Sequence, residues 1–393
     1  MNKFLSFIYS TRLMAVLFLI FAASMGVATF IENDHGTETA KALIYNAWWF
    51  EGIMVFFAIN FFGNIFKYKL LRKEKLVVLT FHLAFFLIIV GAGITRYISF
   101  EGIMPIQEGN VSNTFLSDKN YISIVVNDGN EQKAPFHKPI LLSTISNNNF
   151  NYYTDFKGTD VSVKLTNYTP NATEVFEENE TGDEYLLLVE SGGGGRHNHY
   201  IKKGDIENVH GVQVGFDSPN NNVIDFKTVD GNLKIKSAVD GQFYRMADKF
   251  EGTIVKDSLQ EFSILSVHAV AGLQFVVPSG PVKGAYKTVS GDKDANSLAQ
   301  LEFEVIAGGE TKHIKLNGGK FAIQPPTQFS VGNLNFRMSY GAMQMQLPFS
   351  IKLNDFQLDK YPGSDSAMSF ASEVTVIDPS ETFDFRIFMN NIL

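Results

Sequence analysis

Three long apolar runs occupy the first hundred residues, and the rest of the chain alternates between polar and apolar positions. The runs cover about residues 13–31, 48–66 and 76–95, and the last has 20 residues without Asp, Glu, Lys or Arg. At about 1.5 Å of rise per residue, such a helix crosses the roughly 30 Å hydrocarbon core of a bilayer. The pattern predicts a region of three transmembrane helices over residues 1–100.

The first run has a second interpretation, a cleaved signal peptide, because Lys3 and Arg12 precede it. Its 19 residues exceed the apolar core of about 7–15 residues that signal peptides carry, and two further runs follow. We therefore interpret it as a retained span. Trp48 and Trp49 begin the second run, as expected of aromatic residues at a membrane interface.

Charge around the runs predicts their orientation. Lys3 and Arg12 precede the first run, the loop over residues 32–41 is mostly acidic, and the loop over residues 67–75 is strongly basic. Because Lys and Arg favour the cytoplasmic side, the N-terminus and the loop over residues 67–75 are expected in the cytoplasm. Everything after Arg96 is then expected outside it.

Residues 101–393 are expected to form a large, mainly antiparallel β domain outside the cytoplasm. Period-two alternation between Asn, Asp and Gly turns is typical of half-buried antiparallel strands. Strands are predicted at residues 121–126, 161–165, 185–189, 212–216, 233–236, 301–306, 349–353 and 374–377. The region is long enough for one large sandwich or barrel-like domain or for two subdomains.

Composition excludes several classes of site. The chain has no cysteine, so it holds no disulfide, iron–sulfur cluster or thiolate zinc site of its own. Its net charge is −8 and no basic, aromatic patch is evident, so nucleic acid is not an expected partner. No GxSxG, HExxH or P-loop motif occurs, and no catalytic residue is predicted.

His82 is the candidate functional residue, because it lies inside the third run. Six residues of helix place it roughly 9 Å into the membrane from the cytoplasmic side. An ionisable side chain at that depth is costly and usually faces a partner, a cavity or a cofactor. Neutral histidine is also the commonest protein ligand of metals, haem iron included. The alternative is a plain hydrogen bond to a neighbouring helix.

The exported region holds most of the other histidines. His197 and His199 are two positions apart, so on a strand they would share a face and would suit a metal ion. No third ligand is evident near them in the sequence. The remaining histidines of this region, at positions 137, 210, 268 and 313, are expected to be structural or solvated.

Several short segments, in this order, carry a resemblance to a known family. They are Ser-Thr-Arg-Leu at 10–13, Ala-Thr-Phe-Ile at 28–31, Tyr-Asn-Ala-Trp-Trp-Phe at 45–50, Asn60, Phe-His-Leu at 81–83, Gly-Ala-Gly at 91–93, Gly102 through Gly109, Leu-Pro-Phe-Ser-Ile-Lys-Leu-Asn-Asp-Phe at 347–356, Tyr-Pro-Gly at 361–363 and Phe-Ala-Ser at 370–372. The layout resembles the ResB-like proteins of System II cytochrome c biogenesis.

The resemblance implies a component of cytochrome c assembly in the bacterial inner membrane, with its large domain in the periplasm. Such a component helps carry haem across the membrane and present it for attachment to apocytochrome c. It implies haem b as cofactor, with His82 as an axial ligand of the iron. The implied partners are a CcsA-like membrane half, fused or separate, and apocytochrome c. The family's later spans and CcsA-like half do not follow residue 393, so the chain resembles a fragment or subunit of a haem lyase, not catalytic alone.

Two functional hypotheses therefore stay open. In the first, His82 holds haem in the inner half of the membrane, and the second ligand comes from a partner helix or from Met14, Met25 or Met54. Arg96 and the basic loop over residues 67–75 are candidate contacts for haem propionates, although anionic lipid explains the loop equally well. In the second, the chain is a membrane-anchored β scaffold without cofactor, and His82 is a helix–helix contact.

Overall fold

The computed structural model describes residues 3–192, 195–219, 223–292, 297–389 and 391, and they fall into two compact units. Unit 1 joins residues Met1–Ala172 and Ser290–Leu393, and unit 2 is residues Thr173–Val289 between them. Each unit has its own hydrophobic core cluster of strand residues. The chain therefore enters unit 2 in the middle of unit 1 and returns to finish it.

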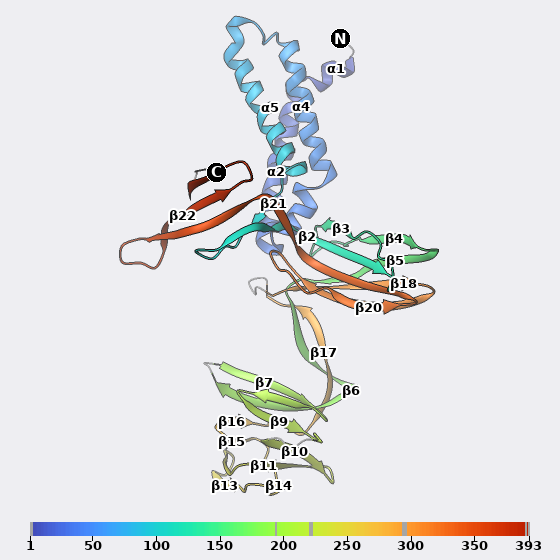
Figure 1. Ribbon diagram of the computed structural model, residues 1–393, viewed down its shortest axis with the longest axis vertical. Helices are drawn as coiled ribbons and strands as arrows, with labels where there is room; N and C mark the ends of the chain where they lie inside the picture. The colour runs from blue at the N-terminus through green and yellow to red at the C-terminus, as the bar shows by residue number, and fades with distance from the viewer. Residues whose placement is uncertain (1–2, 193–194, 220–222, 293–296, 390, 392–393) are drawn as a thin grey trace. The chain divides into compact units, whose positions relative to one another are not determined.

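The N-terminal helices confirm the three predicted apolar helices (Figure 1). The helical elements are α1 (Lys3–Ile8), α2 (Thr11–His35), α3 (Thr37–Ala40), the π-helical turn η1 (Lys41–Tyr45), α4 (Trp48–Lys67), the 3₁₀ turn η2 (Lys73–Lys75) and α5 (Leu76–Tyr97). Among the described residues, α2, α4 and η2–α5 are long and apolar enough to cross a membrane. Each extends up to a few residues beyond the apolar run that predicted it, where the flanking polar residues continue the helix.

Polar side chains fix the start of the helical bundle. The Ser10 hydroxyl accepts a hydrogen bond from the Leu13 backbone amide at 3.1 Å and so caps α2. The Asn60 side-chain amide, buried in α4, donates to the backbone carbonyls of Ile8 and Ser10. Both carbonyls lie at the α1–α2 break, where an unpaired backbone group in an apolar medium would be costly, and the Ser10 carbonyl also accepts the Met14 backbone amide. The buried Asn60 amide therefore has a structural role, because it joins α4 to the break between α1 and α2.

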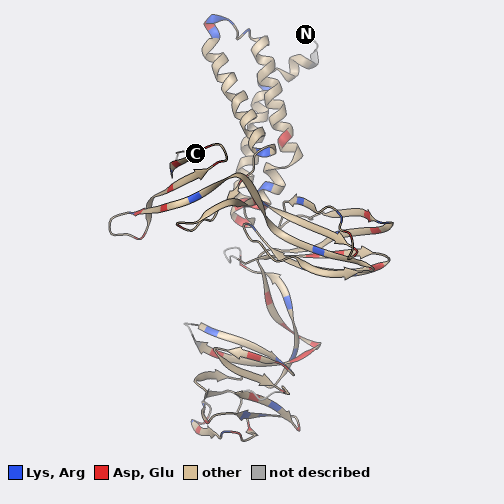
Figure 2. Cartoon of the chain, in the orientation of Figure 1, with Lys and Arg blue, Asp and Glu red and all other residues tan. Residues whose placement is uncertain are grey.

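Aromatic packing holds α2 against α4, with α5 at the edge. Phe57 and Phe61 of α4 are each 5% exposed in a cluster that also contains Leu17 of α2. The helices carry few charges, and a basic group marks the turn between α4 and α5 (Figure 2). No residue of α5 is buried. One long apolar helix thus offers most of its surface to lipid or to another helix.

The β part of unit 1 is a two-layer sandwich with a three-stranded extension. Its strands are β1 (Gly102–Ile103), β2 (Val111–Asn127), β3 (Phe136–Ile140), β4 (Asn151–Phe156), β5 (Thr159–Thr169), β18 (Ala299–Ala307), β19 (Glu310–Gly318), β20 (Thr327–Val331), β21 (Leu334–Lys360), β22 (Ala367–Ile377) and β23 (Thr382–Phe388). One sheet has the order β1-β2-β21-β22-β23, with β3 and β20 beside β2 and β21, and the other is β19-β18-β5-β4. Inward side chains of both sheets, such as Ile124, Phe303 and Phe336, form one core.

Unit 2 contains two further sheets around a second core. Its strands are β6 (Ala172–Gly192), β7 (Gly195–Lys202), β8 (Ile206–Val209), β9 (Val212–Phe216), β10 (Ile224–Val229), β11 (Asn232–Ser237), β12 (Gly241–Arg245), β13 (Phe250–Ile254), β14 (Gln260–Glu261), β15 (Ser266–Val270), β16 (Leu273–Val276) and β17 (Val282–Ser290). The sheets are β14-β11-β10-β9-β8 and β13-β12-β15-β16-β6-β17, with β7 on β6. Described pairings in both units are antiparallel apart from β9–β10, which confirms the predicted fold class.

Candidate functional site

His82 lies on the side of α5 that faces α4. Its ring is half-buried and meets the ring of Phe61 edge-on, with centroids 5.3 Å apart. Phe85, one helical turn further along α5, stacks on the same Phe61 ring at 4.7 Å. The imidazole therefore stands at the edge of an aromatic cluster, held by two helices but not enclosed by them.

The two ring nitrogens of His82 have different environments. Nδ1 is 2.9 Å from the carbonyl oxygen of Val78, one turn earlier in α5. A carbonyl only accepts hydrogen bonds, so in the neutral ring Nδ1 carries the proton and Nε2 keeps a free electron pair. Nε2 has no hydrogen-bond partner among the residues that the structure describes. This is the tautomer and orientation in which histidine coordinates a metal, with the backbone fixing the ring from behind.

The intramolecular candidates for a second ligand are not gathered around His82. Met25 and Met54 line a cavity at the opposite end of the helices, and Met14 packs in the core between the helices. His35 ends α2 near that same cavity, and 15 residues of α5 separate its end of the bundle from His82, which is about 20 Å of helix. Met25, Met54 and His35 therefore lie away from the His82 ring, whereas Met14 packs against the cluster that contains Phe61.

That cavity has a volume of about 2090 Å³. The ends of α2, α4 and α5 give it an apolar wall, through residues such as Phe21, Phe50 and Ile89, and β2 and β21 give it a polar wall. His82 does not line it. The cavity and the histidine are therefore separate features of unit 1.

A polar network joins α3 to the sandwich at this cavity. The Glu38 carboxylate accepts a hydrogen bond from the Asn120 side-chain amide at 2.9 Å, and Asp118 pairs with Lys320 at 2.6 Å and with Lys41 at 3.6 Å. Burial raises the pKa of Glu38 above its ordinary value, although Lys320 and Lys41 oppose the shift. The hydrogen bond from Lys320 lowers the pKa of Asp118.

The cationic side chains near the spans have partners within the chain. The Arg96 guanidinium pairs with Glu51 and donates to the carbonyl oxygen of Tyr45 at 2.6 Å, so it ties the end of α5 to the start of α4. Lys67 donates to the Tyr9 carbonyl oxygen at 2.8 Å. The role of these residues as propionate contacts stays a prediction.

His197 and His199 both lie on β7, as their spacing requires, and β7 pairs with β6. Glu190 of β6 is 3% exposed, and one of its oxygens lies 3.8 Å from His199 Nε2 and 2.8 Å from His210 Nε2. His210, expected to be structural or solvated, is thus an ion-pair partner supplied by the β8–β9 turn. Among the described residues, no group of three or more His, Asp and Glu side chains is placed to hold a metal ion.

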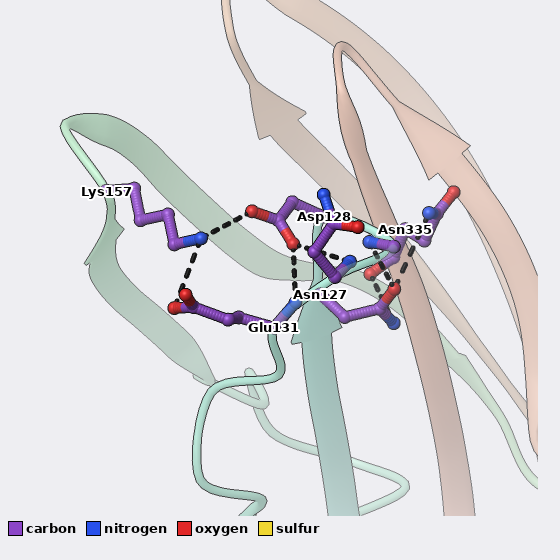
Figure 3. Close-up of polar contacts among 7 residues, drawn as sticks. Asn127, Asp128, Glu131, Lys157 and Asn335 are labelled. Atoms are coloured by element: carbon purple, nitrogen blue, oxygen red, sulfur yellow. Dashed lines mark hydrogen bonds and ion pairs between the residues drawn. The ribbon is translucent and has the colours of Figure 1, made fainter.

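A second polar cluster closes the turn after β2 (Figure 3). Asp128 accepts hydrogen bonds from the backbone amides of Asn130 and Glu131 and from the Lys157 ammonium group at 2.7 Å. These bonds lower the pKa of Asp128 well below its usual range. Since each polar group serves the turn, the cluster is structural.

A known protein that is much longer than this chain matches nearly all of it. No known family model matches the chain. Over 382 residues the chain is 40% identical to Protein NrfI of Wolinella succinogenes. The match covers 97% of this chain and 29% of NrfI, so the chain spans under a third of that relative's length. The helical region, with His82, and both β units therefore belong to the part shared with a much longer protein.

Proposed function

We propose that this chain is a haem-handling component of cytochrome c maturation and that His82 Nε2 is an axial ligand of haem iron. The observation that carries the proposal is the hydrogen bond from Nδ1 to the Val78 carbonyl, which leaves Nε2 with its electron pair inside an apolar helix. The order of the ResB-like segments and the long match to NrfI support the assignment to this process.

The surroundings of His82 fit a flat, apolar macrocycle. Phe61 and Phe81 flank the imidazole edge-on, and the other faces of α5 have no buried residue. Haem bound there supplies the porphyrin and iron, and the chain supplies one nitrogen, an aromatic wall and an apolar medium. The second ligand then comes from a partner membrane helix, since the described residues of this chain bring none to Nε2.

The charge pattern supports a direction for haem transfer across the membrane. The basic turn between α4 and α5 suits the cytoplasmic side, which would place His82 in the inner half of the bilayer and the β units in the periplasm. Haem coming from inside would then meet His82 first. The network of Glu38, Asn120 and Asp118 at the other end of the bundle would couple the spans to the β sandwich.

The test is the haem content of the full chain, co-expressed with its CcsA-like partner under haem-replete conditions. We expect a Soret band in the wild type and a loss of roughly tenfold or more in His82→Ala, because one axial ligand is removed. His35→Ala is the matched control and should keep the band, since His35 lies at the far end of the helices. A His82→Cys variant that binds haem with a shifted Soret band would identify this position as a ligand directly.

Two results would contradict the proposal. Equal haem in wild type and His82→Ala would remove the ligand role. No haem in either, with the partner present, would favour the alternative of a membrane-anchored β scaffold.

A further inference from the structure

The three C-terminal strands of unit 1 form a sheet with two unlike faces. In its register, Leu358 lies opposite Phe370, Val374 opposite Phe385 and Val376 opposite Phe383. Residues directly opposite in an antiparallel pair point to the same face, so these apolar side chains share one side of the sheet. We call Phe356, Leu358, Phe370, Phe383 and Phe385 the apolar face.

The apolar face is open where the sheet leaves the sandwich. Phe356, Phe370 and Phe383 are 46%, 51% and 40% exposed, and Leu358 is 44% exposed. Phe356 and Phe370 stack on each other with centroids 6.3 Å apart, and both rings stay exposed among the residues that the structure describes. Contiguous exposed aromatic residues of this kind mark a contact surface.

The opposite face carries charged and polar side chains that pair with one another, beside the exposed ring of Phe388. The Arg386 guanidinium donates to Glu373 at 2.8 Å and to Gln357 at 2.9 Å, and the Ser369 hydroxyl donates to Asp359 at 2.7 Å. These bonds leave that face suited to water. The sheet is therefore amphipathic, like the interfacial elements that lie flat on membranes.

The position of the sheet within unit 1 favours lipid as the occupant. Figure 1 shows β22 at the height of the helix ends nearest the sandwich, running across the helix direction. The 22 residues of α5 span about 33 Å, so this end coincides with a bilayer boundary. At the end of α5, Tyr97, Ile98 and Phe100 are 69%, 68% and 74% exposed, as expected of side chains at such a boundary.

We propose that the apolar face of β21–β22–β23 lies on the bilayer interface beside the spans. Phenylalanine and leucine side chains enter the boundary between headgroups and acyl chains, while the polar face stays in water. The spans hold the sheet at the surface, so even a modest affinity for lipid keeps it there. This contact would hold the β sandwich of unit 1 close to the membrane surface.

The cysteine-free sequence permits a direct test by single-cysteine labelling of the full chain in lipid nanodiscs. Phe370→Cys and Ser369→Cys place the same fluorophore on opposite faces of one strand, and Leu358→Cys and Asp359→Cys repeat the comparison on the next strand. Nitroxide-labelled phospholipid is the quencher, and Phe100→Cys is the positive control. We expect quenching at 358 and 370 to exceed that at 359 and 369 by roughly threefold or more.

Each outcome bears on the proposal. Strong quenching at the apolar positions alone, with Phe100→Cys also quenched, supports contact with lipid. Equal quenching on both faces, or none at 358 and 370, overturns it and favours a second copy or a protein partner on this face. Far-ultraviolet circular dichroism confirms that each labelled variant is folded. The result does not depend on haem, so it is separate from the outcome for His82.

Discussion

The histidines of this chain differ in what their two ring nitrogens contact. His199 bonds to Glu207 through Nδ1, and His210 bonds to Glu190 through Nε2, so both act as partners of carboxylates. His82 instead uses a backbone carbonyl of its own helix and keeps Nε2 free among aromatic rings. Metal-ligating histidines bond their second ring nitrogen to a backbone carbonyl, a carboxylate or water, and at His82 that partner is the Val78 carbonyl. This difference could not be predicted from spacing along the sequence.

Glu38 shows how burial at a junction costs stability. Its carboxylate lies between α3 and the sandwich, and its folded pKa is raised from the ordinary value of 4.5. Such a group stabilises the fold below its unfolded pKa and loses that contribution as the pH rises through its folded pKa. The ionised form is therefore the unfavourable one at neutral pH.

We expect Glu38→Gln to raise the stability of unit 1 by roughly 1 kcal/mol at pH 7–8 and to have little effect near pH 4. Glutamine keeps an oxygen for the Asn120 amide and removes the buried charge. Thermal unfolding in detergent across this pH range measures the difference. Glu101→Gln, at an exposed position, is the control, and a stabilisation that did not vary with pH would disprove the electrostatic explanation.

At the scale of single elements, strand β15 buries a histidine in an aromatic stack. His268 is 1% exposed and stacks on Phe262 at 4.2 Å and on Phe275 at 5.3 Å. Burial lowers the pKa of His268 to about 4, although the hydrogen bond between Nδ1 and the Ser266 carbonyl opposes the shift. The unfolded chain, with an ordinary pKa of 6.5, then binds more protons than the folded one between these values.

The free energy of unfolding of unit 2 should therefore fall by up to about 3 kcal/mol as the pH falls from 6.5 towards 4. Above pH 6.5 the contribution of His268 should not vary with pH. Hydrogen exchange of peptides from β15 and β16, corrected for the intrinsic pH dependence of exchange, measures this loss locally. His268→Phe should abolish it, because phenylalanine fills the stack without titrating. His313→Gln, at an exposed position of unit 1, should leave it intact; an unchanged acid response in His268→Phe would show that another group is responsible.

The elements that sequence patterns predict best are those with one dominant period. The three apolar runs became α2, α4 and α5, and the alternating stretch at 212–216 is β9 to the residue. Strand length was harder to predict. β6 and β21 continue through polar residues, as at 176–184 and 354–360, because cross-strand pairing and polar side-chain bonds hold segments that have no apolar alternation. The apolar face of β22 and β23 likewise appears only once the register is known.

At the scale of the whole chain, the insertion of unit 2 into unit 1 was beyond the reach of local patterns. No proline-rich or low-complexity segment marks residues 172 and 290, because the chain crosses between the units on paired strands, β6 and β17. What separates the units is that each has a hydrophobic core of its own. Phe303 and Phe336 pack in one, and Phe216 and Phe275 pack in the other.

Unit 2 should fold alone. A segment of about 120 residues with its own buried core is within the size at which domains are independently stable, by roughly 5–15 kcal/mol. We expect residues 173–289, expressed by themselves, to unfold in one cooperative transition in urea, followed by circular dichroism. The complementary chain, with these residues replaced by a short Gly-Ser linker between Ala172 and Ser290, should keep the sandwich core.

The linker variant also separates the roles of the two units. If His82 is the haem ligand, the linker variant should retain the Soret band of the full chain when its partner is present. The contacts that hold the helices together and to the sandwich lie within unit 1, such as the Arg96 bond to the Tyr45 carbonyl and the Asn120 bond to Glu38. Activity in cytochrome c maturation, measured in the same cells, then reports what unit 2 adds beyond haem binding. A non-cooperative isolated unit 2, or a linker variant that no longer folds, would show that the two cores depend on each other and would refute the independence of the units.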